Sequence, residues 1–320
     1  MPQLPIDPRQ AEIFERLDAF GEDAGYFEPL GPRHGALFCD EGTTLLVTFE
    51  TLDACKGDPD GRPMGQRIAA RHGWSSLSLI ADGPTWFRDR AVFGFFDRQV
   101  DDAFFEDFDR VIFWGAGMCG YAAAAFSVTA PGATVILAAP QATLDPAVTG
   151  WDGRFARLRR MNFTDRYGYA PDMIEGAGPV YVIYDPLDTA DAMHASLFTR
   201  PFVQKLPCPF IGRGPARMLA DMGLIEPLLE AAAADDFSAA DFWRLYRARR
   251  SHRPWLRRFA AVLEQRERPV LSAIVNRNAG SRLGDSQFRS RFKDLSDEIA
   301  GRGGSIPPAR RPAERPAPVL

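Results

Sequence analysis

Apolar residues recur at helical spacing near the start of the chain. Within residues 8–20, Ile13 and Leu17 belong to a stripe of apolar side chains three or four positions apart, which predicts a helix with one apolar face. Asp7 stands at the expected N-cap and Pro8 at the first helical position, where a missing N–H costs nothing. The pattern therefore predicts an amphipathic helix that packs on a core.

Short apolar runs follow, without the alternation that a half-exposed strand shows. Such runs are typical of strands buried on both faces of a parallel sheet. Six are predicted as strands: 43–50, 75–82, 109–115, 133–140, 179–186 and 206–212. Predicted helices lie between several of them, at 91–108 and 118–130, and a short one follows the last strand, at 215–223. This order predicts an α/β fold, with a mostly parallel sheet covered by helices on both faces.

The pattern turns helical from about residue 237, and the last twenty residues are rich in Pro, Arg and Gly. That final composition is typical of a disordered tail. The sequence therefore predicts four parts: an N-terminal helix and lead-in (1–29), an α/β domain (30–232), an Arg-rich helical appendage (233–300) and a tail (301–320).

Charge separates the C-terminal part from the rest. Residues 241–320 carry 18 Arg or Lys and 8 Asp or Glu, a net charge of +10, whereas the chain as a whole has a net charge of −4. The overall acidity argues against nucleic acid as the partner. The basic part has two interpretations: a docking surface for an acidic partner or nucleic acid, or solvated Arg-rich helices that also pack on the acidic body.

Composition places the chain among ordinary globular proteins, with 46% hydrophobic and 25% charged residues. The first residues lack a basic region followed by an apolar core, so no secretory signal is expected. The cysteines, Cys39, Cys55, Cys119 and Cys208, form neither a CxxC pair nor a zinc spacing. We therefore expect reduced thiols, a cytoplasmic location, and no metal or cofactor.

The most informative segment is VIFWGAGMCGYAAAAF, residues 111–126. A buried strand runs into a tight turn and then into a helix of small residues. That is the layout of a nucleophile elbow, whose motif is G-x-S-x-G. The turn aims one side chain off the sheet, beside helix N-terminal amides that hold an oxyanion.

On these residues the chain resembles the α/β-hydrolase fold, and in particular bacterial relatives with a G-x-S-M-G-G-Y-A-A elbow. The matching stretch is Gly-Ala-Gly-Met-Cys-Gly-Tyr-Ala-Ala, residues 115–123, and the order of elements matches over roughly 40–230. The resemblance implies an α/β-hydrolase-like fold with a Ser–His–acid site.

The catalytic positions depart from that pattern. Gly117 stands where the family has its nucleophilic serine, and Arg213 follows Gly212 where the family has its histidine. Asp185 or Asp188 occupies the place of the acid. Because nucleophile and base are both missing, ordinary serine-hydrolase activity is not expected. The resemblance then implies an unconventional or inactive hydrolase homologue that binds a ligand or a partner.

Two alternatives remain open. In one, the chain is a hydrolase or acyl transferase with unusual residues: Cys119 as nucleophile at the start of the elbow helix, with Asp185 and Arg213. Against this, Cys119 lies two residues past the nucleophile position, where a small buried residue is the simpler interpretation. In the other, the chain is an interaction protein that acts through its basic C-terminus.

Other polar residues near the predicted strand ends are weaker candidates. Asp185, Asp188, Asp191 and His194 have metal-ligand chemistry, but they also suit helix capping. Arg213 together with Arg217 suits an ion pair to Asp185 or Asp188, or an anionic ligand.

Met118, Trp86 and Arg88 are candidates for a ligand cleft, since loops at the carboxyl ends of strands line such clefts. Packing at the core or its rim is the other interpretation of Trp86 and Arg88. His34 and His72 are expected in solvated loops.

Some relatives of this kind carry a sulfonucleotide reductase label. That chemistry uses a PP-loop of the S-G-G-x-D-S type and a reactive cysteine in a C-terminal E-C-G motif. Neither motif occurs here, and no cysteine lies beyond Cys208. The motifs therefore do not support that label.

Overall fold

The computed structural model describes residues 8–234 and 237–309, and the chain divides into two compact units, Met1–Tyr246 and Arg247–Leu320. This division lies later in the chain than the predicted boundary after residue 232. The predicted N-cap Asp7, and the predicted tail beyond residue 309, lie outside the described residues.

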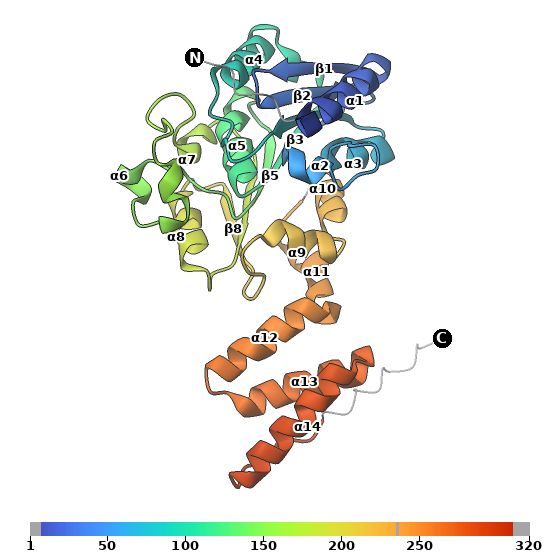
Figure 1. The fold of residues 1–320 in the computed structure, drawn as a ribbon, viewed down its shortest axis with the longest axis vertical. Helices are drawn as coiled ribbons and strands as arrows, with labels where there is room; N and C mark the ends of the chain where they lie inside the picture. Colours follow the sequence, from blue (N-terminus) through green and yellow to red (C-terminus); the bar gives the residue numbers. More distant parts are fainter. Residues whose placement is uncertain (1–7, 235–236, 310–320) are drawn as a thin grey trace. The chain divides into compact units, whose positions relative to one another are not determined.

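The first unit is built on one eight-stranded sheet in the order β1-β2-β4-β3-β5-β6-β7-β8 (Figure 1). Its strands are β1 (Gly25–Leu30), β2 (His34–Cys39), β3 (Thr44–Thr51), β4 (Ser75–Ala81), β5 (Arg110–Ala116), β6 (Thr134–Ala138), β7 (Val180–Tyr184) and β8 (Val203–Pro207). β2 pairs antiparallel with β1 and β4, and every other pairing is parallel. The predicted α/β-hydrolase-like fold is confirmed by this sheet.

The sequence missed two strands, β1 and β2, because residues 25–39 read as a lead-in loop. The burial explains why they form: His34–Cys39 is almost wholly buried, between β1 and β4. Two histidine predictions also fail. His34 lies in β2, only 2% exposed, with Nε2 2.8 Å from Thr85 Oγ1. His72 ends a helix, with Nε2 3.1 Å from Glu226 Oε1.

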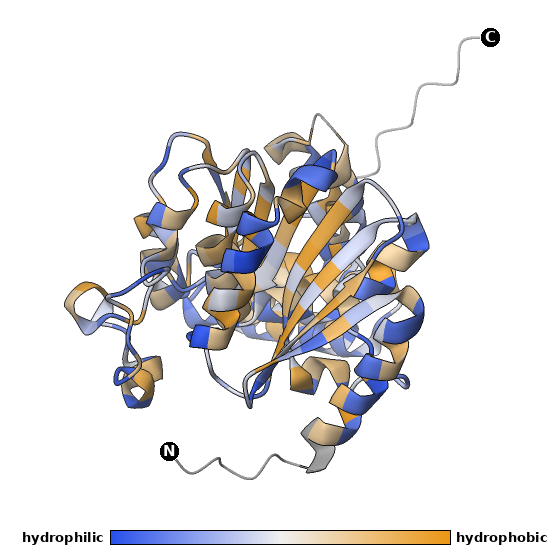
Figure 2. Cartoon of the chain, turned by 90° about the horizontal axis from the view of Figure 1, so that it is seen from above, coloured by the Kyte–Doolittle hydropathy of each residue, from blue (hydrophilic) through white to orange (hydrophobic). Residues whose placement is uncertain are grey.

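Helices cover both faces of the sheet. Alternate residues of a strand point to opposite faces, so Val47 and Phe49 of β3 pack with Phe126 of α5 (Met118–Phe126), whose ring lies 5.7 Å from that of Phe49. Leu37 of β2 packs in a second cluster with Leu17 of α1 (Pro8–Ala24), as the apolar stripe predicted. Figure 2 shows bands of hydrophobic residues along the strands, and surrounding helices that carry both hydrophobic and hydrophilic residues.

The other helices of this unit are shorter or lie between strands. They are α2 (Leu52–Cys55), α3 (Met64–His72), α4 (Arg90–Asp101), α6 (Pro146–Thr149), α7 (Ala170–Met173), α8 (Thr189–Leu197), α9 (Pro215–Asp221), α10 (Ile225–Ala233) and α11 (Ala239–Leu245). Short 3₁₀ helices span Phe104–Asp107, Ser127–Thr129, Gly153–Leu158 and Tyr246–Ser251, the last across the boundary between the units.

The second unit is helical, as predicted for the C-terminal part. It contains α12 (Arg253–Gln265), α13 (Pro269–Leu283) and α14 (Ser286–Gly301), and a small core forms around Ala273 and Leu295. Asp285 caps α14. Within the described ranges of the whole chain, no helix combines the length and the apolar character that crossing a membrane requires.

Candidate functional site at the carboxyl edge of the sheet

The turn between β5 and α5 has the backbone of a nucleophile elbow. Gly117 has φ +58° and ψ −123°, a conformation that glycine adopts without strain and other residues rarely do. Its N–H donates to Ala138 O (2.9 Å), and its carbonyl accepts from Tyr121 N. A Cβ built on Gly117 would meet nothing within 4 Å. The elbow is therefore formed, with open space where a nucleophilic side chain would begin.

The neighbouring glycines have a different role. A Cβ on Gly115 would lie 2.1 Å from Cys119 O, and one on Gly120 would lie 3.1 Å from Gly115 O. Real Cβ contacts are never as short as the first of these. Gly115 is therefore needed so that helix α5 can approach strand β5, and Gly120 keeps that approach free of a tight contact, whereas Gly117 is not constrained by packing.

The Cys119 thiol is not placed for catalysis. The residue is 6% exposed and belongs to the main hydrophobic core. Burial, and then the nearby Glu50 carboxylate, raise the pKa of the thiol far above its ordinary value, so the nucleophilic thiolate is suppressed. This position supports the interpretation of Cys119 as a small buried residue, and it argues against the hypothesis of a thiol nucleophile.

Arg88 is held by the protein itself. Its guanidinium pairs with Asp165 and donates to the carbonyls of Asn162 and Arg166. The side chain is 3% exposed, and its Cζ lies 4.8 Å from the centre of the Phe93 ring. All of these contacts are internal, so packing is the role that the structure gives Arg88.

Asp185 joins the loops that follow β7 and β8. It is fully buried. Its Oδ1 accepts from Leu187 N (2.9 Å) and its Oδ2 from Gly212 N (2.7 Å). The neighbouring Arg213 pairs instead with Asp188, Nε to Oδ2 at 2.7 Å, and its own side chain is 76% exposed. The residue at the histidine position is thus a surface cation that is tied to Asp188 and not to the buried acid.

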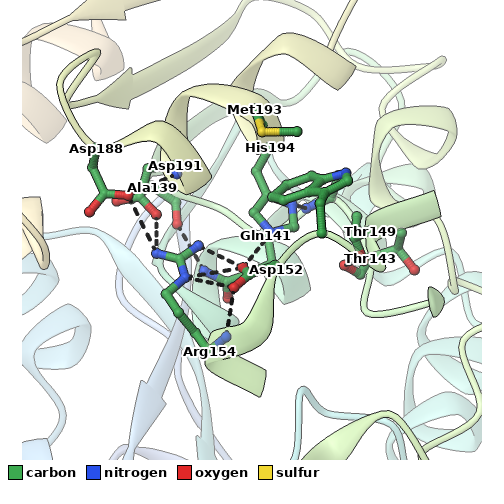
Figure 3. Close-up of polar contacts among 12 residues, drawn as sticks. Ala139, Gln141, Thr143, Thr149, Asp152, Arg154, Asp188, Asp191, Met193 and His194 are labelled. Carbon is green, nitrogen blue, oxygen red and sulfur yellow. Dashed lines mark hydrogen bonds and ion pairs between the residues drawn. The ribbon is translucent and has the colours of Figure 1, made fainter. Parts of the chain in front are cut away.

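Asp188 also belongs to a network centred on Arg154 (Figure 3). Arg154 Nη1 lies 2.6 Å from Asp191 Oδ1 and 3.8 Å from Asp188 Oδ1, while Nη2 lies 2.8 Å from Asp152 Oδ2. Burial alone would raise the pKa of Asp188, but its bond to Arg213 and the field of Arg154 outweigh it, so the pKa lies below the ordinary value. Burial raises the pKa of Asp191.

His194 is neutral, and both of its ring nitrogens are occupied. Ala142 N donates to Nδ1 (3.1 Å), so the ring proton is on Nε2, which lies 3.1 Å from Asp152 Oδ2. Burial lowers the pKa of His194, and the attraction of Asp152 offsets this only in part. With no free lone pair, the imidazole is available neither as a base nor as a metal ligand.

The aspartates around His194 are accounted for by capping and ion pairs. Asp188 is the N-cap of α8, where its side chain accepts from Asp191 N (3.2 Å). Within residues 8–234 and 237–309, no group of three or more His, Cys, Asp and Glu residues is arranged to hold a metal ion. The capping interpretation is therefore the one that the geometry supports.

Sequence reasoning missed three charged residues of this region. Asp152 caps the short 3₁₀ helix Gly153–Leu158, which contains Arg154 and lies between β6 and β7, and nothing in the sequence marks these two residues. Glu50 carried a signal, because it is the single charge in the apolar run TTLLVTFE. Its buried carboxylate accepts from Met64 N and Gly65 N, both at 2.8 Å, and so caps α3.

Three of the non-glycine residues with positive φ lie in loops that follow strands at this edge. Trp86 (φ +49°) follows β4, Ala139 (φ +46°) follows β6 and Phe210 (φ +69°) follows β8. Left-handed conformations of such residues cost roughly 1–3 kcal/mol each and cluster at functional sites. Because the carboxyl ends of parallel strands share one edge, these turns lie at the same edge of the sheet as the elbow.

Two buried polar atoms at this edge lack hydrogen-bond partners among the described residues. They are Trp86 Nε1, on a side chain 2% exposed, and Gln141 Oε1, on one 4% exposed. Trp86 packs at 4.9 Å from the Phe155 ring. Met118, at the first position of α5, is partly buried against the core. A donor and an acceptor therefore remain unsatisfied near the elbow.

No known family profile matches the chain, and no curated protein matches its sequence. Among solved structures, similar chains include the capsule O-acetyltransferase of Neisseria meningitidis serogroup A (12% identity, TM-score 0.38, 62% of this chain and 96% of that one). A Pyrobaculum calidifontis esterase is 14% identical, with TM-score 0.38, over 65% of this chain and 84% of its own.

A third similar structure is the Staphylococcus aureus fluorophosphonate-binding serine hydrolase F. It is 11% identical, with TM-score 0.40, over 65% of this chain and 96% of its own. At identities and TM-scores this low, the likenesses say nothing about activity. The strand order and the elbow of this chain give it an α/β-hydrolase-like fold.

Proposed function

We propose that this α/β-hydrolase-like protein does not catalyse serine-type hydrolysis and instead binds a small ligand at the carboxyl edge of its sheet. The observation that carries the proposal is Gly117: the elbow backbone is intact, the space for a side chain is open, and no nucleophile is present. The predicted cytoplasmic location stays a prediction.

The surroundings of Gly117 support the loss of catalysis. Asp185 uses its two oxygens to hold backbone N–H groups, and Arg213, at the histidine position, is a cation paired with Asp188. An arginine stays protonated at physiological pH and cannot accept a proton from a hydroxyl. Neither the base nor its orienting acid is therefore in place for a Ser–His–Asp relay.

Two features of the carboxyl edge of the sheet support the ligand part of the proposal. Strained turns after β4, β6 and β8 and the unpaired Trp86 Nε1 and Gln141 Oε1 are costs that a stably folded protein rarely keeps without use. A molecule with one hydrogen-bond acceptor and one donor has the two groups that these atoms lack. Acyl amides have both groups.

The test uses short acyl esters, thioesters and amides with two readouts, turnover and melting temperature. We expect no turnover above buffer, with a commercial esterase as positive control. We also expect at least one acyl amide to raise the melting temperature of wild type, and to raise that of Gln141→Leu less.

The outcomes separate the hypotheses. Turnover that disappears in Cys119→Ala would make the thiol the nucleophile and overturn the proposal. Turnover that survives in Cys119→Ala would place an active site elsewhere and also overturn it. If no compound shifts the melting temperature of wild type, the ligand part of the proposal is wrong.

A further inference from the structure

The second unit contains a cavity of about 690 Å³ that is lined only by its own residues, from Arg247 to Arg282. One wall is apolar, with Trp255 and Phe259 of α12 and Ile274 of α13. This volume lies within the range of about 300–1,000 Å³ that is usual for small-molecule sites. The cavity is thus large enough for a ligand of that class.

The charged residues that line the cavity are all positive. Four arginines line it, and no Asp or Glu does: Arg247, Arg249, Arg250 and Arg282. Elsewhere in the same unit arginines are neutralised by carboxylates, as in Arg253–Asp285 at 3.0 Å and Arg291–Glu264 at 2.6 Å. Within the described part of the chain, Arg247, Arg250 and Arg282 make no such ion pair.

One of these arginines is fixed in position. Arg282 Nη1 donates to Ser251 Oγ (3.1 Å), and its Nη2 donates to the backbone carbonyl of Arg250. Nearby, the Arg249 guanidinium lies 5.6 Å from the centre of the Trp255 ring. Positive charge is therefore held beside an apolar wall before any ligand arrives, which lowers the cost of ordering on binding.

We infer that this cavity binds an anionic amphiphile, a molecule with a carboxylate on a hydrocarbon body. The carboxylate would take charge-assisted hydrogen bonds from the arginines. The hydrocarbon would lie against Ile274 and Phe259, which are partly exposed, beside the buried Trp255. Arg247, Arg250 and Arg282 make no ion pair within the described residues, so their like charges repel one another, and a bound anion relieves that repulsion. The inference concerns the second unit alone, so its failure would leave the proposed function of the elbow untouched.

The test is calorimetric titration of the full chain with decanoate below its micelle concentration. We expect saturable binding that weakens with added salt. Decanol, which lacks the charge, and acetate, which lacks the chain, should each bind at least tenfold more weakly. The variant Arg247→Gln/Arg250→Gln should bind decanoate about tenfold or more weakly, because two charged donors are lost.

The matched control is Arg302→Gln, which also removes a surface arginine of this unit but one paired with Glu298 at 2.8 Å. Its affinity for decanoate should equal that of wild type. Circular dichroism before titration confirms that each variant is folded. Two results would overturn the inference: no binding of decanoate by wild type, or equal affinity in wild type and the double variant.

Discussion

At the carboxyl edge of the sheet, the loop after β5 and the loops after β7 and β8 differ in which features of a hydrolase site they keep. After β5, the backbone has the conformation of a nucleophile turn, and only the side chain is missing at Gly117. After β7 and β8, the charged side chains are present, but they are engaged in structure: Asp185 with backbone N–H groups and Arg213 with Asp188. The fold thus depends on the geometry of this edge, and it persists without the catalytic groups.

The largest loss of stability should come from substitution of Gly115. Gly117, two residues further along the chain, provides the contrast. Gly115→Ala places a Cβ 2.1 Å from Cys119 O, so α5 must move from β5, at a cost of about 3 kcal/mol or more. Gly117→Ser enters open space, so only backbone strain of about 1–2 kcal/mol remains. Urea unfolding measures both. Equal losses at the two positions would show that Gly117 is as packed as Gly115.

The next largest loss of stability should come from removing a buried charge near His194. Asp152→Ala leaves Arg154 and His194 without their shared partner, and breaking such a pair costs about 3 kcal/mol. The control is Asp172→Ala, where an exposed carboxylate lies 3.4 Å from Arg200 and the loss should stay within about 0.5 kcal/mol. A similar small loss in both variants would contradict the structural role of Asp152.

Acid should destabilise the first unit through His34. Burial lowers the pKa of His34 to about 4, against an ordinary value of 6.5. The folded state therefore keeps this ring neutral while the unfolded state takes up a proton below pH 6.5, so stability is lost as the pH falls from 6.5 toward 4. Between pH 7 and pH 5, His34→Gln should lose about 2 kcal/mol less free energy of unfolding than wild type. If wild type and His34→Gln lose the same free energy of unfolding between pH 7 and pH 5, this prediction is wrong.

The smallest loss of stability should come from substitution of Arg213. Its side chain is 76% exposed, and ion pairs of that kind contribute within about 0.5 kcal/mol. Arg213→Ala should therefore leave the urea midpoint almost unchanged. A loss above 1 kcal/mol would mean that the histidine position has become part of the structural core.

The parallel strands β3 to β7 and helix α5 were predicted well, because the residue patterns that mark them lie within short segments of the sequence. Apolar runs and the small residues around the elbow located β3 to β7 and α5 to within a few residues. The antiparallel strands β1 and β2 were missed because a short hairpin has no helix between its strands. β8, predicted at 206–212, lies at Val203–Pro207, since its exposed polar start hides the strand pattern.

The site was only partly predictable. The resemblance marked Gly117, Asp185 and Arg213 by their order after strands, which is a property of the sequence. The pairing of Arg213 with Asp188, and the role of Arg154 between three aspartates, depend on where separate loops meet. No spacing along the chain encodes those contacts.

The most direct test of the central claim is the intact mass of the protein after exposure to a fluorophosphonate, a reagent that modifies activated serines. The chain has an elbow without a nucleophile, so the mass of the wild type should not change. A mass increase of one phosphonyl group on folded protein, absent after heat denaturation, would reveal an activated serine and contradict the account.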